Sequence, residues 1–525
     1  MPKYIPIIGL EIHVELKTKS KMFCSSPNDP FIDTPNVHIC EVCTAQPGTL
    51  PVPNREAIAW TVKIARALGC EINEISKFDR KHYFYPDLPK AYQISQYDEP
   101  VGEKGKIMLL LNTSSQDENP RRQPVIGVTR VHLEEDTAKL NHDAVGNTLV
   151  DFNRAGVPLV EIVSDPDIQN GTEAKAYCQE LQMIFRYLGV SDADMEKGQM
   201  RCEANISLQE EGKYKIEGAI VNPIGDYQLN PKVECKNINS FRAVEKAIDY
   251  EIARQTEMLE RGQTWRQETR GWDEGKQATV HQRFKETSAD YRYFPEPDIP
   301  PFHPLKVAGE IVMPELPIAK RLRFNEQFGF SYADALLLTA DKRWASYVEE
   351  MISELHEWLH TLPETKDCES HNSKEKNAVC LPTQELTRLA GGWLTSKLMG
   401  AMKERELEIG NLKVKPENFA ELIALVYAQR VNSTNAQKIL GEMIDSGVDI
   451  DPTHIMEEKG YGQISDEGAI AKVVDEIITS YPKQVADFKA GKEPILKFLI
   501  GMVMKATQGS ADPIVAEKVL RDKMK

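Results

Sequence analysis

The stretch GLEIHVEL at residues 9–16 alternates apolar and charged side chains, and this alternation decides the fold of the first half of the chain. Because the side chains of a β-strand point alternately to opposite faces, its four apolar residues are expected to face a core. The charged residues Glu11, His13 and Glu15 are expected on the other face. The pattern recurs at 128–136 (VTRVHLEED), 157–165 (VPLVEIVSD), 200–208 (MRCEANISL) and 232–236 (KVECK). The sequence therefore predicts a sheet with one chemically active face.

Helical spacing of apolar residues separates these strands and dominates the rest of the chain. The segments 53–69, 172–189 and 239–262 are predicted to be helices that pack on the core. Five prolines in 295–304 (PEPDIPPFHP) mark a domain boundary, since proline is excluded from helix interiors and central strands. A second boundary is expected near 411–416, and the polar stretch 363–382 is expected to be a surface loop.

These patterns together predict an α+β fold with three domains. Residues 1–300 form a sheet-based domain with flanking helices, residues 301–412 form an all-helical domain, and residues 413–525 form a helical tail domain.

The charge of the chain excludes one class of function. A net charge of −16 and a pI near 5.3 are incompatible with a generic nucleic-acid coat, which binds through many lysine and arginine contacts to phosphate. The segment 481–525 differs, because nine basic and five acidic side chains give it a net charge of +4. The charge of the whole chain therefore does not exclude a local contact between this segment and nucleic acid.

The chain is predicted to be cytoplasmic. Its first residues lack the pattern of a signal peptide, and no apolar run is long enough to cross a membrane. Its nine cysteines are odd in number and scattered, which fits a reducing compartment better than a disulfide framework.

The sequence lacks the short motifs of common nucleotide-binding and hydrolytic enzymes. It contains no G-x-x-x-x-G-K-[ST], G-x-G-x-x-G, H-E-x-x-H or G-x-S-x-G, and no serine-rich amidase signature. An active site in this chain would therefore be built from dispersed residues of the sheet.

The charged face of the strands suits phosphoryl transfer. Carboxylates with an imidazole can hold Mg²⁺, which keeps several of its waters. Arginine and lysine beside them can clamp phosphate oxygens, and phosphoryl transfer needs chiefly positioning and charge neutralisation. The alternative is the ordinary solvated face of half-buried strands.

Seven blocks of the first 300 residues resemble a known family. They are GLEIHVEL (9–16), HYFYPDLPKAYQISQ (82–96), RVHLEEDTAKL (130–140), DFNRAGVPLVEIVSDPD (151–167), MRCEANIS (200–207), VECKNINSFRAVEKAI (233–248) and KETSADYRYFPEPDIP (285–300). With EEKGYGQISDEG (457–468) and GKEPILKFLIGMVMKATQGSADP (491–513), they resemble the B subunits of glutamyl-tRNA(Gln)/aspartyl-tRNA(Asn) amidotransferases over nearly the whole chain.

The resemblance implies an activity and partners. Such proteins use ATP and Mg²⁺ to phosphorylate the side-chain carboxylate of Glu-tRNA(Gln) or Asp-tRNA(Asn), and ammonia from a separate amidase then displaces the phosphate. The resemblance implies a heterotrimer with the amidase (the A subunit) and a small C subunit, a cradle-like sheet domain, and a tail that helps to hold tRNA. The alternative is a tRNA-binding scaffold without kinase chemistry of its own. The archaeal relative specific for tRNA(Gln) is disfavoured, because 363–382 is too short for its large insertion.

The resemblance and the charged faces together assign the site residues. The predicted magnesium ligands are Glu11, His13 and Glu134, and Glu203 joins them as a catalytic residue. The predicted ATP contacts are Arg201, Lys232 and Lys236, with Lys90 and Tyr92 of the loop PDLPKAYQ expected in the same pocket; Arg154 and Glu161 are further candidates. The alternative for His13 is a histidine bonded into the sheet face, and for Lys232 and Lys236 it is simple solvation.

Three cysteines form part of a zinc-ribbon pattern. The C-x₂-C pair Cys40 and Cys43 follows the single Cys24, where some relatives carry C-x-C and this chain has Ser26. A structural zinc site has four ligands, so three thiolates are one short, although His38 could complete the set. The three cysteines could bind a structural Zn²⁺ or remain as buried free thiols. Because a fourth ligand is missing, free thiols are favoured.

Overall fold

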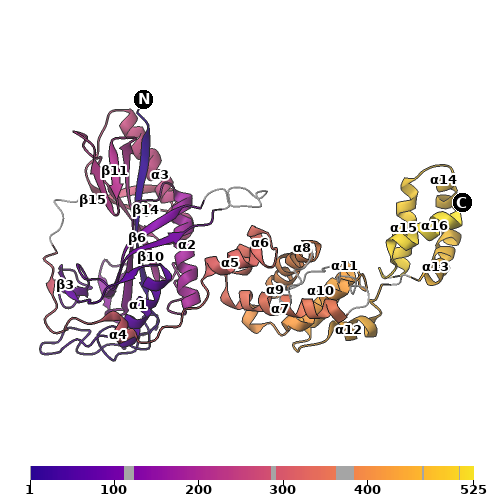
Figure 1. The fold of residues 1–525 in the computed structure, drawn as a ribbon, viewed down its shortest axis with the longest axis horizontal. Helices are drawn as coiled ribbons and strands as arrows, with labels where there is room; N and C mark the ends of the chain where they lie inside the picture. The colour runs from indigo at the N-terminus through magenta and orange to yellow at the C-terminus, as the bar shows by residue number, and fades with distance from the viewer. Residues whose placement is uncertain are drawn as a thin grey trace, which may run out of the picture. The chain divides into compact units, whose positions relative to one another are not determined.

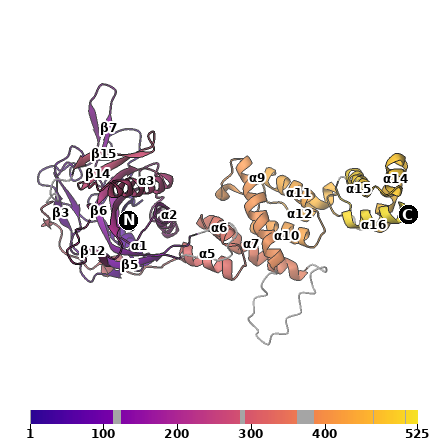
Figure 2. The same ribbon diagram turned by 90° about the horizontal axis from the view of Figure 1, so that it is seen from above.

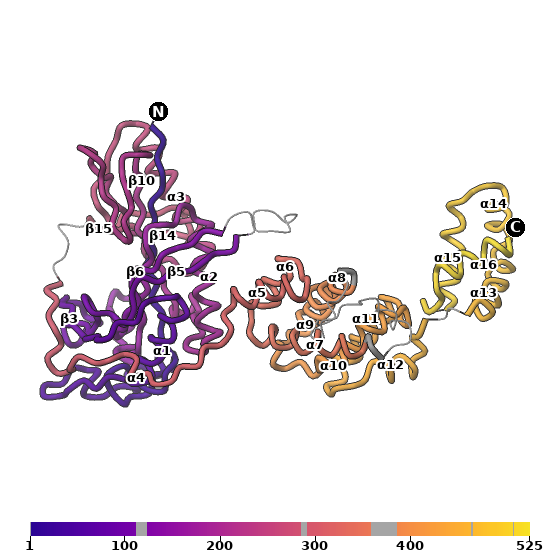
Figure 3. The backbone as a smooth tube through the Cα atoms, viewed as in Figure 1, coloured from indigo at the N-terminus to yellow at the C-terminus, as the bar shows by residue number. Residues whose placement is uncertain are grey.

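A computed structural model describes residues 2–111, 123–284, 291–361, 384–463, 466–507 and 509–524. The chain divides into two compact units, Met1–Ala319 and Lys320–Lys525. The strands of the described residues all lie in the first unit, whereas the second is built from helices (Figures 1, 2 and 3). The predicted α+β class is therefore confirmed. The division into three domains at 300 and 412 stays a prediction, and the predicted loop 363–382 lies outside the described residues.

The first unit is organised around a nine-stranded sheet. Its strands, in spatial order, are β15 (Ala278–Phe284), β14 (Glu268–Asp273), β13 (Val233–Ile238), β10 (Met200–Glu210), β1 (Tyr4–Glu15), β9 (Pro158–Ser164), β6 (Val125–Glu135), β5 (Gly102–Met108) and β2 (Glu71–Ile72). Neighbours pair antiparallel except β13 and β14, which are parallel. The five strands predicted from alternation are β13, β10, β1, β9 and β6, which are consecutive in the sheet. Their charged faces therefore lie side by side.

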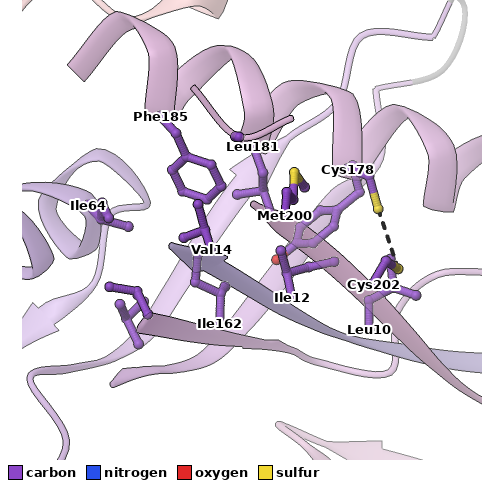
Figure 4. Packing of buried hydrophobic residues seen from close by; sticks show 14 of the residues in the cluster. Leu10, Ile12, Val14, Ile64, Ile162, Cys178, Leu181, Phe185, Met200 and Cys202 are labelled. Atoms are coloured by element: carbon purple, nitrogen blue, oxygen red, sulfur yellow. Dashed lines mark hydrogen bonds between the residues drawn. The ribbon is translucent and has the colours of Figure 1, made fainter. Parts of the chain in front are cut away.

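One face of the sheet is buried under helices. The helices are α1 (Arg55–Ala67), α2 (Gly171–Leu188) and α3 (Phe241–Glu260), close to the predicted ranges. Each begins where a polar side chain accepts a hydrogen bond from a free backbone amide, at Asn54, Asn170 and Ser240. Figure 4 shows Leu181 and Phe185 of α2 lying over β1. The apolar side chains of residues 9–16 thus lie in the core, as predicted.

Smaller strand groups lie outside the main sheet. A three-stranded sheet joins β16 (Phe294–Pro295), β3 (Asp79–His82) and β4 (Tyr92–Ser95). Two hairpins are formed by β7 (Lys139–His142) with β8 (Thr148–Asp151), and by β11 (Tyr214–Glu217) with β12 (Ile220–Pro223). The three-stranded sheet brings segments that are far apart in sequence next to each other, because Phe294 pairs with Arg80.

The second unit contains two apolar clusters. One runs from Phe324 to Ile455 and includes α7 (Lys342–Thr361), α10 (Pro416–Tyr427) and α11 (Ser433–Asp445). The other is formed by α13 (Glu467–Ser480), α15 (Pro494–Ala506) and α16 (Pro513–Met524). In the described part of the chain, no helix combines the length and the apolar character that crossing a membrane requires.

We expect the stability of α10 to depend on the protonation of Glu421. Burial raises the pKa of this carboxyl to about 7, although Thr453 donates a hydrogen bond to it. Since the folded-state pKa lies above the unfolded value of 4.5, the stability of α10 is complete below about pH 4.5 and is lost as pH rises from there to about 7. Glu421→Gln should therefore stabilise α10 at pH 8, by on the order of 1 kcal/mol, and change little at about pH 4. Hydrogen exchange of the α10 amides, corrected for intrinsic rates, measures this.

The exposed Glu476 of α13, a helix of the other apolar cluster, provides the control. Glu476→Gln should leave α10 exchange unchanged at both pH values. Equal protection of wild type and Glu421→Gln at pH 8 would contradict the expectation.

Candidate functional site

The charged faces of the five central strands line one cavity of about 510 Å³. It contains six of the predicted site residues: Glu11, His13, Glu134, Arg201, Glu203 and Lys236. Glu161, a further candidate, also lines it. The register explains the gathering, because His13 of β1 lies opposite Arg201 of β10 on one side and Glu161 of β9 on the other. The residues that the alternation placed on one face therefore form one site.

His13 is surrounded by carboxylates. Its Nε2 lies 3.6 Å from Glu11 Oε1, 3.6 Å from Glu134 Oε1 and 3.4 Å from Glu161 Oε2. Although burial acts in the opposite direction, these carboxylates raise the pKa of His13 to about 9. The ring of His13 is therefore directed at three acidic groups of the sheet face, and its role as a metal ligand stays a prediction beside the alternative of a histidine bonded into that face.

A second histidine shares the same carboxylates. His132 Nε2 lies 3.4 Å from Glu161 Oε2 and 3.9 Å from Glu134 Oε2. Two sets of three donors, Glu11–His13–Glu161 and His132–Glu134–Glu161, each have ligand atoms within 4.8 Å of one another. Glu161 belongs to both sets. Carboxylate oxygens with an imidazole fit a hard divalent cation that keeps several waters, so the donor set suits Mg²⁺.

The carboxylates of this cluster differ in their tendency to ionise. Burial and the neighbouring Glu161 raise the pKa of Glu11 to about 7. The pKa of Glu161 is lowered well below its usual value, because the two histidines outweigh the effect of burial. The Glu161 carboxylate is therefore ionised between the two imidazoles. Glu134 supplies a second negative charge, because Lys81 and His132 lower its pKa although burial raises it.

Cationic side chains lie around the carboxylate cluster. Arg130 Nη2 lies 3.4 Å from Glu161 Oε1, and Lys236 Nζ lies 2.7 Å from Glu203 Oε2. Arg201 Nη2 donates to Asp136 Oδ2 at 2.7 Å. Lys81 is held positive: burial lowers its pKa, but Glu134 and other groups raise it more. The cavity thus combines carboxylates that can ligate a cation with arginine and lysine side chains that can donate hydrogen bonds to phosphate oxygens.

Three aromatic side chains stand beside these charges. Tyr97 and Tyr293 stack with ring centroids 4.3 Å apart, and the Tyr291 ring lies 5.3 Å from Lys81 Nζ. All three line the cavity, as does Tyr83, so flat aromatic rings form part of its wall.

Four predicted site residues lie elsewhere. Lys90 and Tyr92 do not line this cavity, because Lys90 Nζ pairs at 2.7 Å with Glu135, whose side chain is on the opposite face of β6 from Glu134. They line a neighbouring cavity with two of the three predicted zinc ligands. Lys232 lines a third cavity, and Arg154 donates to the carbonyl groups of Thr137 and Ala138. The prediction that Lys90 and Tyr92 share the pocket of Glu134 is therefore wrong.

The predicted thiol cluster exists. The sulfur atoms of Cys24, Cys40 and Cys43 all lie within 4.8 Å of one another. His38 is not among these donors; it is half-buried, and its Nδ1 contacts the carbonyl of Asp29 at 3.4 Å. The expectation that His38 could complete a zinc site is therefore not met.

A buried lysine lies beside the thiols instead. Lys21 is fully buried, and its ammonium donates to Cys43 Sγ at 3.8 Å and to the carbonyl of Phe152 at 3.1 Å. Hydrogen bonds from Cys24, with the nearby Lys21, lower the pKa of Cys43 to about 5. The positive charge of Lys21 can therefore balance the negative charge of a Cys43 thiolate.

Sequence reasoning missed several residues of the site. His132 stood on the recognised face of 128–136, so its spacing from Glu134 could have included it among the metal ligands. Lys81 gave no such signal because β3 is too short to show alternation, and Tyr291 and Tyr293 gave none because they precede the two-residue strand β16 and lie in no strand.

Comparison with known proteins shows the family of this chain. The family model of the GatB/GatE catalytic domain matches residues 6–309, and that of the GatB domain matches residues 381–524. The B subunits of aspartyl/glutamyl-tRNA(Asn/Gln) amidotransferase from Brevibacillus brevis and Geobacillus thermodenitrificans are 41% identical over 526 residues and 42% identical over 517 residues. The alignments cover 99% and 98% of this chain and the same shares of those proteins.

The chain is one component of a glutamine-dependent ligase of enzyme class 6.3.5, with a role in protein biosynthesis. It belongs to the family of B subunits of aspartyl/glutamyl-tRNA(Asn/Gln) amidotransferases, as a third relative from Prochlorococcus marinus, 42% identical over 527 residues, also indicates.

Proposed function

We propose that the cavity on the sheet phosphorylates the side-chain carboxylate of a misacylated tRNA, Glu-tRNA(Gln) or Asp-tRNA(Asn), with ATP. The acyl phosphate formed on the side chain is then amidated by ammonia that an amidase partner releases from glutamine. The observation that carries this proposal is the joint placement of the Glu11–His13–Glu161 and His132–Glu134–Glu161 donor sets with cationic side chains in one cavity. A scaffold that only binds tRNA would not need this arrangement.

The chemistry requires two displacements. In the first, a carboxylate oxygen attacks the γ-phosphorus of ATP, the bond to the β-phosphate oxygen breaks, and ADP leaves. In the second, the nitrogen of ammonia attacks the acyl carbon, the bond from carbon to the phosphate oxygen breaks, and inorganic phosphate leaves. When bound, Mg²⁺ would neutralise charge on the phosphates.

The residues of the cavity divide between these tasks. Glu11, His13, Glu134, His132 and Glu161 would hold the cation. Arg130, Arg201, Lys236 and Lys81 would neutralise charge on the transferred phosphoryl group, which needs donors that are already in position. No side chain has to act as a covalent nucleophile.

We propose a complex with the amidase (the A subunit) and a small C subunit, formed in the cytoplasm, in which the basic tail helps to hold the tRNA. The experiment that tests the function is reconstitution of the complex with glutamine, ATP and Mg²⁺, with each misacylated tRNA in turn. Amidated aminoacyl-tRNA is the expected product. Binding of misacylated tRNA without release of phosphate from ATP would indicate the scaffold alternative.

We propose free thiols, not Zn²⁺, at Cys24, Cys40 and Cys43. The described donors are one short of the four that a structural zinc uses, and the Lys21 ammonium already supplies positive charge beside Cys43. The purified protein is therefore expected to carry substoichiometric zinc when its metal content is measured by mass spectrometry. One zinc per chain, released when the thiols are modified, would contradict this.

A further inference from the structure

Two thiols outside the catalytic cavity are placed for a reaction of their own. Cys40 Sγ and Cys43 Sγ lie 3.9 Å apart. The two residues flank a turn in which the Thr44 amide donates to the carbonyl of Cys40, and they belong to no helix or strand. The sulfur atoms of a disulfide lie about 2 Å apart, so a movement of about 2 Å within this turn would join the two thiols.

Hydrogen-bond donors converge on Cys43. The backbone amide of Cys40 donates to Cys43 Sγ at 3.1 Å, and the fully buried Lys21 ammonium donates to it at 3.8 Å. Both donors stabilise a negative charge on this sulfur, and the thiolate is the form of cysteine that attacks an electrophile. Cys43 is therefore the reactive member of the pair, and Cys40 is the second thiol that can close a disulfide.

A cavity of about 210 Å³ gives small molecules access to Cys43. Although Cys43 is buried, it lines this cavity together with Cys24, Lys90 and Glu135. The cavity has room for molecules only slightly larger than water, such as hydrogen peroxide. Its size therefore favours a small oxidant over a bulky disulfide.

A second pair of cysteines has the same proximity in different surroundings. Cys178 Sγ of α2 and Cys202 Sγ of β10 lie 3.7 Å apart (Figure 4). Both side chains are buried in the apolar core, where a charged thiolate is disfavoured. Comparison of the two pairs therefore separates the effect of proximity from that of charge stabilisation and access.

We propose that Cys40 and Cys43 form a reversible oxidation site for hydrogen peroxide. Cys43 Sγ attacks one peroxide oxygen, the O–O bond breaks, and the leaving hydroxide takes up a proton and departs as water. Cys40 Sγ then attacks the sulfur of the Cys43 sulfenic acid, the S–O bond breaks, and a second water leaves as the disulfide forms. The peroxide gains two electrons, the two thiols lose them, and the two thiol protons end in the two waters.

The buried Lys21 makes this disulfide easy to reduce. Oxidation removes the negative charge at Cys43, so the Lys21 ammonium loses its charged partner and keeps the carbonyl of Phe152. A buried charge without a counter-charge is costly, and stabilisation of the reduced form makes a disulfide a stronger oxidant. The inference rests on the proposed free thiols, because a bound zinc would occupy both sulfur atoms.

Peptide mapping of the full chain by mass spectrometry tests the proposal. Reduced protein whose zinc content has been measured is treated with hydrogen peroxide, the remaining thiols are blocked, and disulfides are mapped over time. The Cys40–Cys43 disulfide is expected to form about 10 times faster or more than one between Cys178 and Cys202, and dithiothreitol should reverse it.

Variants assign the roles of the neighbouring residues. Lys21→Met should slow formation of the disulfide about 10-fold, whereas Lys19→Met, which removes a nearby exposed lysine, is the matched control and should not. Cys24→Ser should leave the Cys40–Cys43 disulfide unchanged. In Cys24→Ser/Cys40→Ser no second thiol of the cluster is left, so Cys43 should proceed to the sulfinic acid.

Three results would overturn the inference. One is zinc-free, folded wild type in which Cys40 and Cys43 oxidise no faster than Cys178 and Cys202, a comparison that does not depend on the folding of any variant. The others are a disulfide between Cys24 and Cys43 as the main product, and an unchanged rate in folded Lys21→Met. A failure of the proposed free thiols is distinguishable, because it would show as one zinc per chain before peroxide is added.

Discussion

The Glu134→Gln variant is expected to lose tRNA-dependent cleavage of ATP by about 100-fold or more, with its fold intact. Glu134 is buried at the centre of the cavity, where Ser95 donates to its Oε2 at 2.9 Å and His13 Nε2 lies 3.6 Å from its Oε1. Glutamine keeps the size and an acceptor for Ser95. It removes the negative charge that the proposed cation needs.

Release of phosphate from ATP with misacylated tRNA measures this effect, and circular dichroism with thermal unfolding verifies the fold. The exposed Glu71 at the edge of the same sheet provides a matched control, since Glu71→Gln removes a carboxylate far from the cavity in sheet order. Partial recovery of Glu134→Gln at high Mg²⁺ would support a role in holding the cation. Undiminished turnover in folded Glu134→Gln would remove Glu134 from the site.

The Arg80→Met variant is expected to destabilise the first unit by about 3–5 kcal/mol. Arg80 donates two hydrogen bonds to Glu296, from Nε at 2.7 Å and from Nη2 at 2.8 Å, and the side chain of Glu296 is 0% exposed. This pair joins β3 to the proline-rich segment that follows β16. Methionine would leave the Glu296 carboxylate buried without its counter-charge, which costs more than the pair itself contributes.

Urea unfolding of the full chain, followed with a probe in the first unit, measures the loss. The double variant Arg80→Met/Glu296→Met should recover most of it, because no unpaired buried charge is left. The exposed pair of Lys3 and Glu211 is the control, and Lys3→Met should cost about 1 kcal/mol at most. A loss in Arg80→Met no larger than in Lys3→Met would show that Glu296 is not stabilised by this pair.

Much of the sheet could be predicted because strand alternation is a local property. The pattern around Glu11 and His13 was sufficient to separate the core face from the charged face, and the order of five strands then brought Glu134 and Glu203 to the same cavity. The sequence alone could not provide that order, since β9 inserts between β1 and β6 through pairings that local patterns do not specify. For that reason local patterns could not show that β9 places Glu161 between two histidines.

The wrong site predictions concern residues whose side-chain direction is set by packing between segments that are distant in sequence. Lys90 follows a proline-rich loop with no periodicity, and its ion pair with Glu135 directs it away from Glu134. Lys81 reaches the cavity from the short strand β3, and Tyr293 reaches it from the position just before β16; these two strands, distant in sequence, pair with each other. Such residues are identified only when the fold is known.

The proposed function requires that this site transfer the γ-phosphoryl group of ATP to the side-chain carboxylate of the aminoacyl-tRNA. Isotope transfer tests it most directly. Misacylated tRNA is prepared with ¹⁸O in that carboxylate and converted with ATP, glutamine and the reconstituted complex, and the released phosphate is analysed by mass spectrometry. Phosphate that carries one ¹⁸O atom from the carboxylate is the predicted result. Amidated product accompanied by unlabelled phosphate would show that no bond formed between the carboxylate and phosphorus, and would contradict the account.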